Sequence, residues 1–333
     1  MLSRTADHLY WMSRYIERAE SLARLVDAHY RMSLLPHSGE TLAQSLRSTM
    51  TALYMQEAYL ERHKIVEPRA VFEFITIDRE YPGSIFSCLR AARENARAVR
   101  GSLTSELWET LNSTWLDARS QLVRRSTQID IGQFVEWVKE RSHLTRGVTI
   151  GTMMRDDGFH FTRIGTFLER ADSTARILKA HQNDLVPGAD AGDVPDPYAW
   201  SVLLRALSAF EIYRRVFRDV ITPIKVAELL ILRDDIPRSL LRCCKEVYTN
   251  LTSVANDGSA ETERRAGEIH ALLHFSRMEE IAANGLPRFL EQFLERLRDL
   301  GDRIGSDFLI PPAEVSSCSC TSGTKPATAT TVP

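Results

Sequence analysis

Residues 8–29 read HLYWMSRYIERAESLARLVDAH, and residues 160–181 read HFTRIGTFLERADSTARILKAH. Both stretches begin and end with histidine. Both also carry a Glu-Arg pair nine residues after the first histidine, as Glu17-Arg18 and Glu169-Arg170, at an offset of 152 residues. Similarity at a fixed spacing is the sequence signature of a repeated structural unit. The two stretches therefore predict that the chain contains one unit twice.

Two later blocks extend the repeat at an offset of 155 residues. The first block consists of Val71, Glu73, Pro82, Ser84 and Cys88, which recur as Val226, Glu228, Pro237, Ser239 and Cys243. The second consists of Phe134, Glu136, Glu140 and Arg141, which recur as Phe289, Glu291, Glu295 and Arg296. These collinear blocks predict two units, at about residues 1–152 and 155–310.

Apolar residues recur every three or four positions along most of the chain, which is typical of amphipathic helices. We expect the first helix near residues 5–33. Further helices are expected near 40–62, 68–78, 84–100, 103–118, 131–150, 158–182, 197–219, 224–233, 238–254, 260–274 and 286–305. Residues 71–77 could form a strand, but no second strand is available to pair with it. The pattern predicts an all-α, internally duplicated array of about twelve helices, with the two units related by a pseudo-two-fold axis.

Two segments lack this periodicity. Residues 184–197 are rich in Asp, Gly and Pro and predict a loop within the second unit. Residues 311–333 are dominated by Ser, Thr, Pro and Ala, a composition that predicts a disordered tail.

Composition excludes several classes of function. The 333 residues carry a formal net charge of −2, so nothing in the overall charge favours nucleic-acid binding. We expect no membrane span, because no run of 18 apolar residues occurs. The first eight residues lack the apolar core of a signal peptide. The five cysteines form no disulfide framework, which predicts a cytoplasmic protein.

The Glu-Arg motif cannot be an ion pair between sequence neighbours, because adjacent residues point away from each other on a helix. Glu17 shares one flank of its helix with Glu20 and Arg24, whereas Arg18 lies far from the apolar stripe. The second unit repeats this layout with Glu169, Asp172 and Arg176 on one flank and Arg170 behind. Two interpretations remain open. The motif residues could bridge helices where the two units meet, or Arg18 and Arg170 could hold an anionic ligand in a cleft there.

The histidines suggest core positions more than ligands. His8 and His160 fall inside the apolar stripes of their helices. A ferritin-like metal site would need Glu-x-x-His motifs on two helices, but Glu140–His143 has Glu295–Arg298 as its counterpart. His270 and His274 share a helix face but have no obvious third ligand. We therefore predict no metal and no cofactor.

No catalytic signature is present. The sequence has no Gly-rich phosphate loop, nucleophile elbow or kinase motif set. Cys88 and Cys243 follow equivalent Pro-x-Ser helix starts and are expected to be small buried side chains.

The opening residues 2–20, LSRTADHLYWMSRYIERAE, resemble the bacterial Alpha-E family, an α-helical domain of unknown function named for its Glu-Arg motif. The similarity continues through FLERAD at residues 167–172 and covers about residues 1–310. The resemblance implies partners, because members of this family tend to be encoded with a circularly permuted ATP-grasp ligase and a transglutaminase-like cysteine protease. It marks Glu17, Arg18, Glu169 and Arg170 as motif residues without giving them a role.

Two functional hypotheses follow. The first is a non-catalytic partner that binds or scaffolds an ATP-grasp amide ligase or its peptide or amino-acid ligand. The second is an enzyme that uses the Glu/Arg cluster between the units for acid–base or acyl-transfer chemistry. A raised carboxyl pKa in an open cleft at Glu17 or Glu169 would favour the enzyme. A closed and fully paired cluster would favour the partner.

Overall fold

The computed structural model describes residues 1–34, 39–124, 130–181 and 197–309, and these residues contain helices and no strand. The predicted tail at 311–333 and nearly all of the predicted loop at 184–197 lie outside the described residues. The helices are α1 (Ser3–Ser33), α2 (Gly39–Ala52), α3 (Gln56–Leu60), α4 (Pro68–Thr76), α5 (Ile85–Ala98), η1 (Arg100–Ser102), α6 (Ser105–Arg124), α7 (Ile131–Thr152), α8 (Asp157–Ala180), α10 (Pro197–Ala206), α11 (Phe210–Phe217), α12 (Pro223–Ile231), α13 (Leu240–Ser253), α14 (Ala260–Phe275), α15 (Met278–Asn284) and α16 (Leu286–Phe308).

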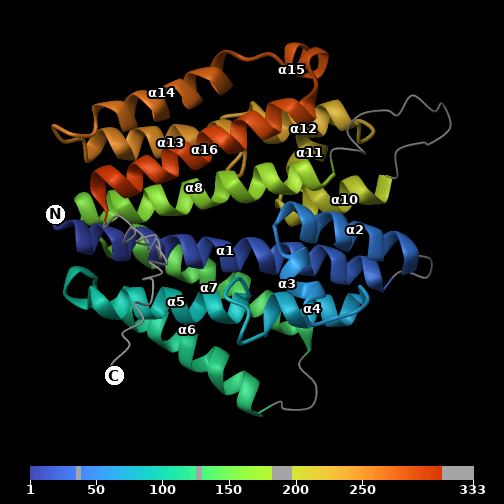
Figure 1. The fold of residues 1–333 in the computed structure, drawn as a ribbon, viewed down its shortest axis with the longest axis horizontal. Helices are drawn as coiled ribbons and strands as arrows, with labels where there is room; N and C mark the ends of the chain where they lie inside the picture. Colours follow the sequence, from blue (N-terminus) through green and yellow to red (C-terminus); the bar gives the residue numbers. More distant parts are fainter. Residues whose placement is uncertain (35–38, 125–129, 182–196, 310–333) are drawn as a thin grey trace, which may run out of the picture.

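Helices α1 and α8 lie side by side and run in the same direction through the middle of the molecule (Figure 1). Helix α1 packs against α5 and α7, and α8 packs against α13 and α16. The two central helices approach closely at Gly165, where an added Cβ atom would overlap the hydroxyl of Ser13 and the carbonyl oxygen of Tyr10. A glycine at this position is what allows the two motif helices to touch.

Short local signals start the flanking helices. Ser84 and Ser239 are the N-cap residues of α5 and α13, and each hydroxyl accepts a hydrogen bond from the backbone N–H three residues later. Pro68 and Pro223 begin α4 and α12, where the missing N–H of proline costs no intrahelical bond. Residues 71–76 are helical, as predicted, and Ile77 is the C-cap of α4.

Several tertiary contacts occur in matched pairs at offsets of 152 to 155 residues. The His8 and His160 imidazoles contact the side-chain oxygens of Asn95 and Asn250, at 2.8 and 2.9 Å. The hydroxyls of Tyr59 and Tyr213 donate to the carbonyl oxygens of Ile65 and Val220. Such pairs are what an internal duplication requires, and the superposition of the two units stays a prediction.

Two of the expected helices are interrupted. The helix predicted over 40–62 is divided into α2 and α3 at Tyr54, and the helix predicted over 197–219 is divided into α10 and α11 at Ser208. Both residues have a left-handed backbone, with φ of 56° and 55°. A left-handed residue cannot continue a right-handed helix. Helix α15 was not predicted.

The apolar side chains form one continuous core that includes residues from both halves. No helix in the described part of the chain is both long and apolar enough to span a bilayer.

Candidate functional site

Glu17 lies on the face of α1 that meets α8, and its side chain is only 2% exposed. Both of its oxygens accept hydrogen bonds from Arg170, at 2.8 and 2.7 Å. Arg238, which directly precedes the start of α13, adds a bond of 2.9 Å. Arg146 from α7 contributes a longer bond of 3.4 Å. The carboxylate is therefore bound by guanidinium groups from three other parts of the chain.

Glu20, one turn further along α1, is fully buried and shares two of these partners. Arg238 bridges the two acids, with a bond of 2.6 Å to Glu20, and Arg146 also bonds to Glu20. Arg24 and Ser142 also bond to Glu20, at 2.9 and 2.6 Å, and the His143 imidazole lies 3.7 Å from it. We call Glu17, Glu20 and their four arginines the closed cluster.

Glu169 on α8 stands in the corresponding place of the second unit and is also 2% exposed. Arg18 bonds to both of its oxygens, at 2.5 and 3.1 Å, and Arg14 adds a bond of 2.8 Å. Asp172, one turn further along α8, pairs with Arg176 at 2.6 Å. We call Glu169, Asp172, Arg14, Arg18 and Arg176 the open cluster, because two cavities adjoin it.

The electrostatics of both motif glutamates favour the charged form. Burial raises the pKa of each carboxyl, but the adjacent guanidinium groups outweigh this effect. The pKa of Glu17 is lowered by Arg170 and Arg238, and that of Glu169 is lowered to about 2 by Arg14 and Arg18. The pKa of Glu20 also lies well below its ordinary value. A carboxylate with such a low pKa is a poor general acid or base near neutral pH.

The structure confirms that the motif residues pair across helices and not with their sequence neighbours. Glu17 meets Arg170, and Arg18 meets Glu169. Arg24 and Arg176 pair within their own helices with Glu20 and Asp172, as their spacing predicts. Arg170 is buried although it lies away from the apolar stripe of α8. Helix α1 and the segment before α13 cover that side of α8, where Arg170 bonds to Glu17 and the carbonyl oxygen of Pro237.

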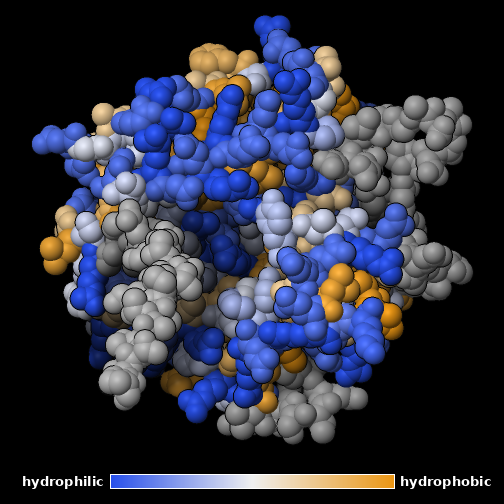
Figure 2. Space-filling model, in the orientation of Figure 1, coloured by the Kyte–Doolittle hydropathy of each residue, from blue (hydrophilic) through white to orange (hydrophobic). Residues whose placement is uncertain are grey.

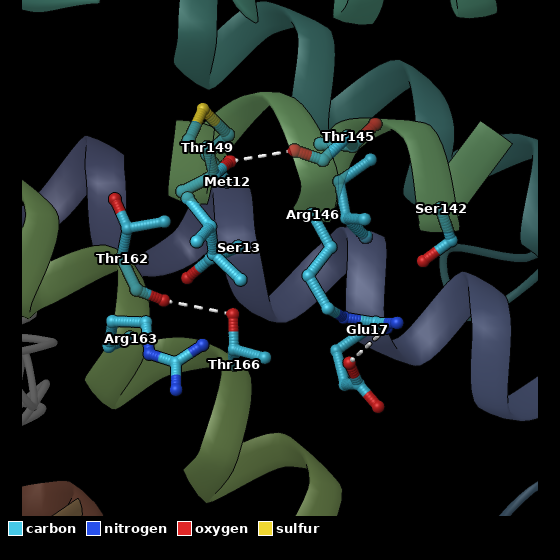
Figure 3. Close-up of a pocket in the computed structure, with 12 residues that line it drawn as sticks. Met12, Ser13, Glu17, Ser142, Thr145, Arg146, Thr149, Thr162, Arg163 and Thr166 are labelled. Carbon is cyan, nitrogen blue, oxygen red and sulfur yellow. Dashed lines mark hydrogen bonds and ion pairs between the residues drawn. The ribbon is translucent and has the colours of Figure 1, made fainter. Parts of the chain in front are cut away.

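Arg146 fills the space between α1, α7 and α8 beside the closed cluster. Figure 3 shows its side chain extending toward Glu17, and the pocket left there measures only about 40 Å³. At the predicted offset of 155 residues, the counterpart of Arg146 is Gly301 on α16. There the structure has a cavity of about 850 Å³ between α1, α8 and α16, which we call the α16 cavity.

Charged side chains of both signs line the α16 cavity. They are Asp7, Arg14, Arg18, Asp172, Arg176, Arg298 and Asp302. Aromatic and aliphatic side chains, including Trp11 and Leu297, complete the wall. Figure 2 shows a hollow with hydrophilic residues near the middle of the viewed face, where α1 and α8 run in Figure 1. This lining suits a polar ligand that carries both charges.

The other predicted residues have structural surroundings. His8 and His160 are half-buried, and each contacts an asparagine on a neighbouring helix. In the described ranges, no group of three or more His, Cys, Asp or Glu side chains is placed to hold a metal ion. Cys88 and Cys243 are buried, and burial raises the pKa of each thiol to about 12. Neither cysteine is an available nucleophile at neutral pH.

Sequence reasoning missed Arg14, Arg146 and Arg238 as partners of the motif glutamates. Each of them stands where the two units differ, opposite Thr166, Gly301 and Gly83 respectively. The search for repeats selects identical positions, so it passed over these residues. A comparison of the mismatches would have included them, but only the structure shows that they reach the motif.

Curated relatives are similar in sequence over most of the chain. An uncharacterized protein of Mycobacterium bovis and two uncharacterized proteins of Mycobacterium tuberculosis are each 26% identical over 336 residues. The alignments cover 93% of this chain but only 37% of each relative. No solved structure matches the chain significantly.

A family model matches residues 1–309, which is nearly all of the chain that the structure describes. The family is described as a predicted α-helical domain with a conserved ER motif. Both copies of the Glu-Arg pair lie within the matched range, at the contact between α1 and α8. On this evidence, the chain belongs to the Alpha-E family.

Proposed function

We propose that this protein is a non-catalytic binding partner of an amide-forming ligase system and holds a peptide or amino-acid ligand in the α16 cavity. The observation that carries the proposal is the state of the two motif glutamates. Both are buried, fully paired and held at low pKa. They can position arginines, but they are poorly suited to transferring protons.

The asymmetry between the two clusters supports a binding role. The closed cluster is filled by its own side chains, as expected of a structural ion-pair network. The open cluster keeps the motif residues but has glycine at the position of Arg146, and the α16 cavity adjoins it. A cavity of this volume, with convergent charged groups, falls in the size range of small-molecule sites.

The alternative function, acid–base or acyl-transfer catalysis at the motif, would need a carboxyl group of raised pKa. The lowered pKa values of Glu17 and Glu169 count against it. An ATP-grasp ligase and a transglutaminase-like protease are the partners that the family resemblance implies. The expected cytoplasmic location belongs to the same proposal.

The test is co-expression of the chain with an ATP-grasp ligase encoded beside it. We expect the two to co-elute on size exclusion, and we expect the chain to raise phosphate release by the ligase in the presence of an amino-acid or peptide substrate. Gly301→Arg should occupy part of the α16 cavity beside the open cluster and abolish that stimulation without unfolding the protein, because an added Cβ atom there meets only Leu168, at 3.7 Å.

Gly147→Arg is the matched control. It introduces the same side chain at an exposed position of α7 where an added Cβ atom meets nothing within 4 Å. This variant should behave as the wild type. Amide formation by the purified chain without any ligase would refute the non-catalytic role, and the absence of any complex with the ligase would refute the partnership.

A further inference from the structure

A second cavity adjoins the open cluster, on the side of Gly83. It measures about 200 Å³ and lies between α1, α8, the turn that contains Tyr54, and the segment before α5. Glu169, Asp172, Arg18 and Arg176 line it together with the rings of Tyr54 and Tyr81. We call it the Tyr81 cavity.

The closed cluster has an arginine in the corresponding place. Arg238 directly precedes Ser239, the N-cap of α13, and Gly83 directly precedes Ser84, the N-cap of α5. The two caps have nearly identical backbones, with φ and ψ of −69° and 153° at Ser239 and of −67° and 156° at Ser84. Arg238 and Gly83 therefore hold equivalent positions relative to their helices.

The acids that bind Arg238 also have counterparts. The Arg238 guanidinium bridges Glu17 and Glu20, at 2.9 and 2.6 Å. Glu169 and Asp172 are equivalent to these two acids at the offset of 152 residues, and both line the Tyr81 cavity. Glycine at position 83 supplies no side chain to bridge them.

From this juxtaposition we propose that the Tyr81 cavity binds a guanidinium or ammonium group of a ligand between Glu169 and Asp172, as Arg238 binds between Glu17 and Glu20. The inference rests on the proposed binding function and names the charge of the group that is recognised. An arginine or lysine side chain of a peptide, or a free arginine, has the required chemistry.

Two further features of the cavity fit a cation. Ser21 lines it, and the buried hydroxyl of Ser21 has no hydrogen-bond partner within the described chain. A buried hydroxyl without a partner is unfavourable, and a ligand N–H would satisfy it. One face of the Tyr81 ring stacks on the Phe74 ring, with 4.3 Å between the ring centroids, and the Tyr81 ring also lies close to Gly83. Aromatic rings beside carboxylates are a common setting for cation recognition.

The arginines beside the cavity do not exclude a cation. Arg18 and Arg176 correspond to Arg170 and Arg24, which lie around Arg238 in the closed cluster. The closed cluster thus already accommodates a guanidinium between two acids beside two equivalent arginines, and Arg146 adds a further cation there as Arg14 does in the open cluster. A side chain at position 83 would clash with Tyr81, because its Cβ atom would lie 2.7 Å from the Tyr81 ring. The chain therefore cannot supply its own guanidinium from this position, and a ligand would supply the cation instead.

Titration calorimetry of the full chain with L-arginine, at constant ionic strength, tests the proposal. L-citrulline is the matched probe, because it has nearly the same shape without the charge. We expect L-arginine to bind at least about tenfold more tightly than L-citrulline, and Asp172→Asn to lose at least about tenfold in affinity for L-arginine. Glu136→Gln, an exposed change outside the cavity, should keep wild-type affinity.

A double variant provides a second test. Tyr81→Ile with Gly83→Arg reproduces the Ile236-Arg238 arrangement of the closed cluster, so it should fold, melt at or above the wild-type temperature and no longer bind L-arginine. Equal binding of L-citrulline, unchanged affinity in Asp172→Asn, preferential binding of L-glutamate, or no binding of any probe would overturn the inference. If L-arginine fails to bind while the ligase still co-elutes, only this inference fails and the proposed function stands.

Discussion

Removal of the Glu17 carboxylate should lower the free energy of unfolding more than removal of any surface carboxylate does. In Glu17→Ala, the Arg170 and Arg238 guanidinium groups lose their shared acceptor. Their side chains are only 6% and 8% exposed, so neither can reach water without moving a helix. Breaking a buried ion pair by removing one partner costs about 3–5 kcal/mol. We expect a loss of that size in the free energy of unfolding, partly limited because Glu20 remains beside Arg238.

Urea denaturation followed by circular dichroism measures this loss. The control is Glu136→Ala, which removes an exposed carboxylate that pairs with the exposed Arg31 and with Lys139, a partly buried side chain that keeps its bond to Asp27. Exposed pairs contribute about 0–1 kcal/mol, so the control should unfold almost as the wild type does. If Glu17→Ala were no less stable than Glu136→Ala, the interpretation of the closed cluster as a structural ion-pair network would be wrong.

Three other predictions follow from individual residues. Acid should destabilise the fold between about pH 5 and 2. The pKa of Glu169 is lowered to about 2 in the folded protein, so as the pH falls this carboxylate is protonated in the unfolded chain before it is protonated in the fold. About 3 kcal/mol of stability that is present above pH 5 is lost in this way. Thermal melts across that range check this, and Glu169→Gln should flatten the dependence. Gly165→Ala should cost about 1–3 kcal/mol because α1 and α8 touch there, whereas Gly147→Ala, at an open helical position, should raise stability by up to about 1 kcal/mol. Equal melting temperatures for the two variants would contradict the close helix contact. Ser208→Gly should stabilise the protein by about 0.5–1 kcal/mol, because glycine adopts the left-handed backbone without strain. Tyr54→Gly should stabilise it less, because it also removes the contact between the Tyr54 ring and the Arg176 guanidinium, which lies 4.7 Å from the ring centroid. The urea midpoints of the two variants measure these gains.

The sequence by itself determined the fold class, and it determined that Glu17 and Arg18 do not pair with each other. Helical periodicity is a local property, so it predicts helices without knowledge of the tertiary structure. Neighbours on a helix diverge by about 100°, so Glu17 and Arg18 had to meet other elements. The repeated pattern left open whether these partners are neighbouring helices or a ligand, and the structure shows that α1 and α8 supply them to each other.

Only the tertiary structure decided which of the two Glu-Arg clusters is closed by its own arginines and which adjoins the cavities. That difference depends on Arg146 and Arg238, which reach the motif across more than 120 and 210 residues of sequence. It also depends on Gly301 and Gly83, whose effect is the space they leave. Neither a long-range reach nor an unfilled volume has a local sequence signal, because both arise only when helices that are distant in the chain pack together.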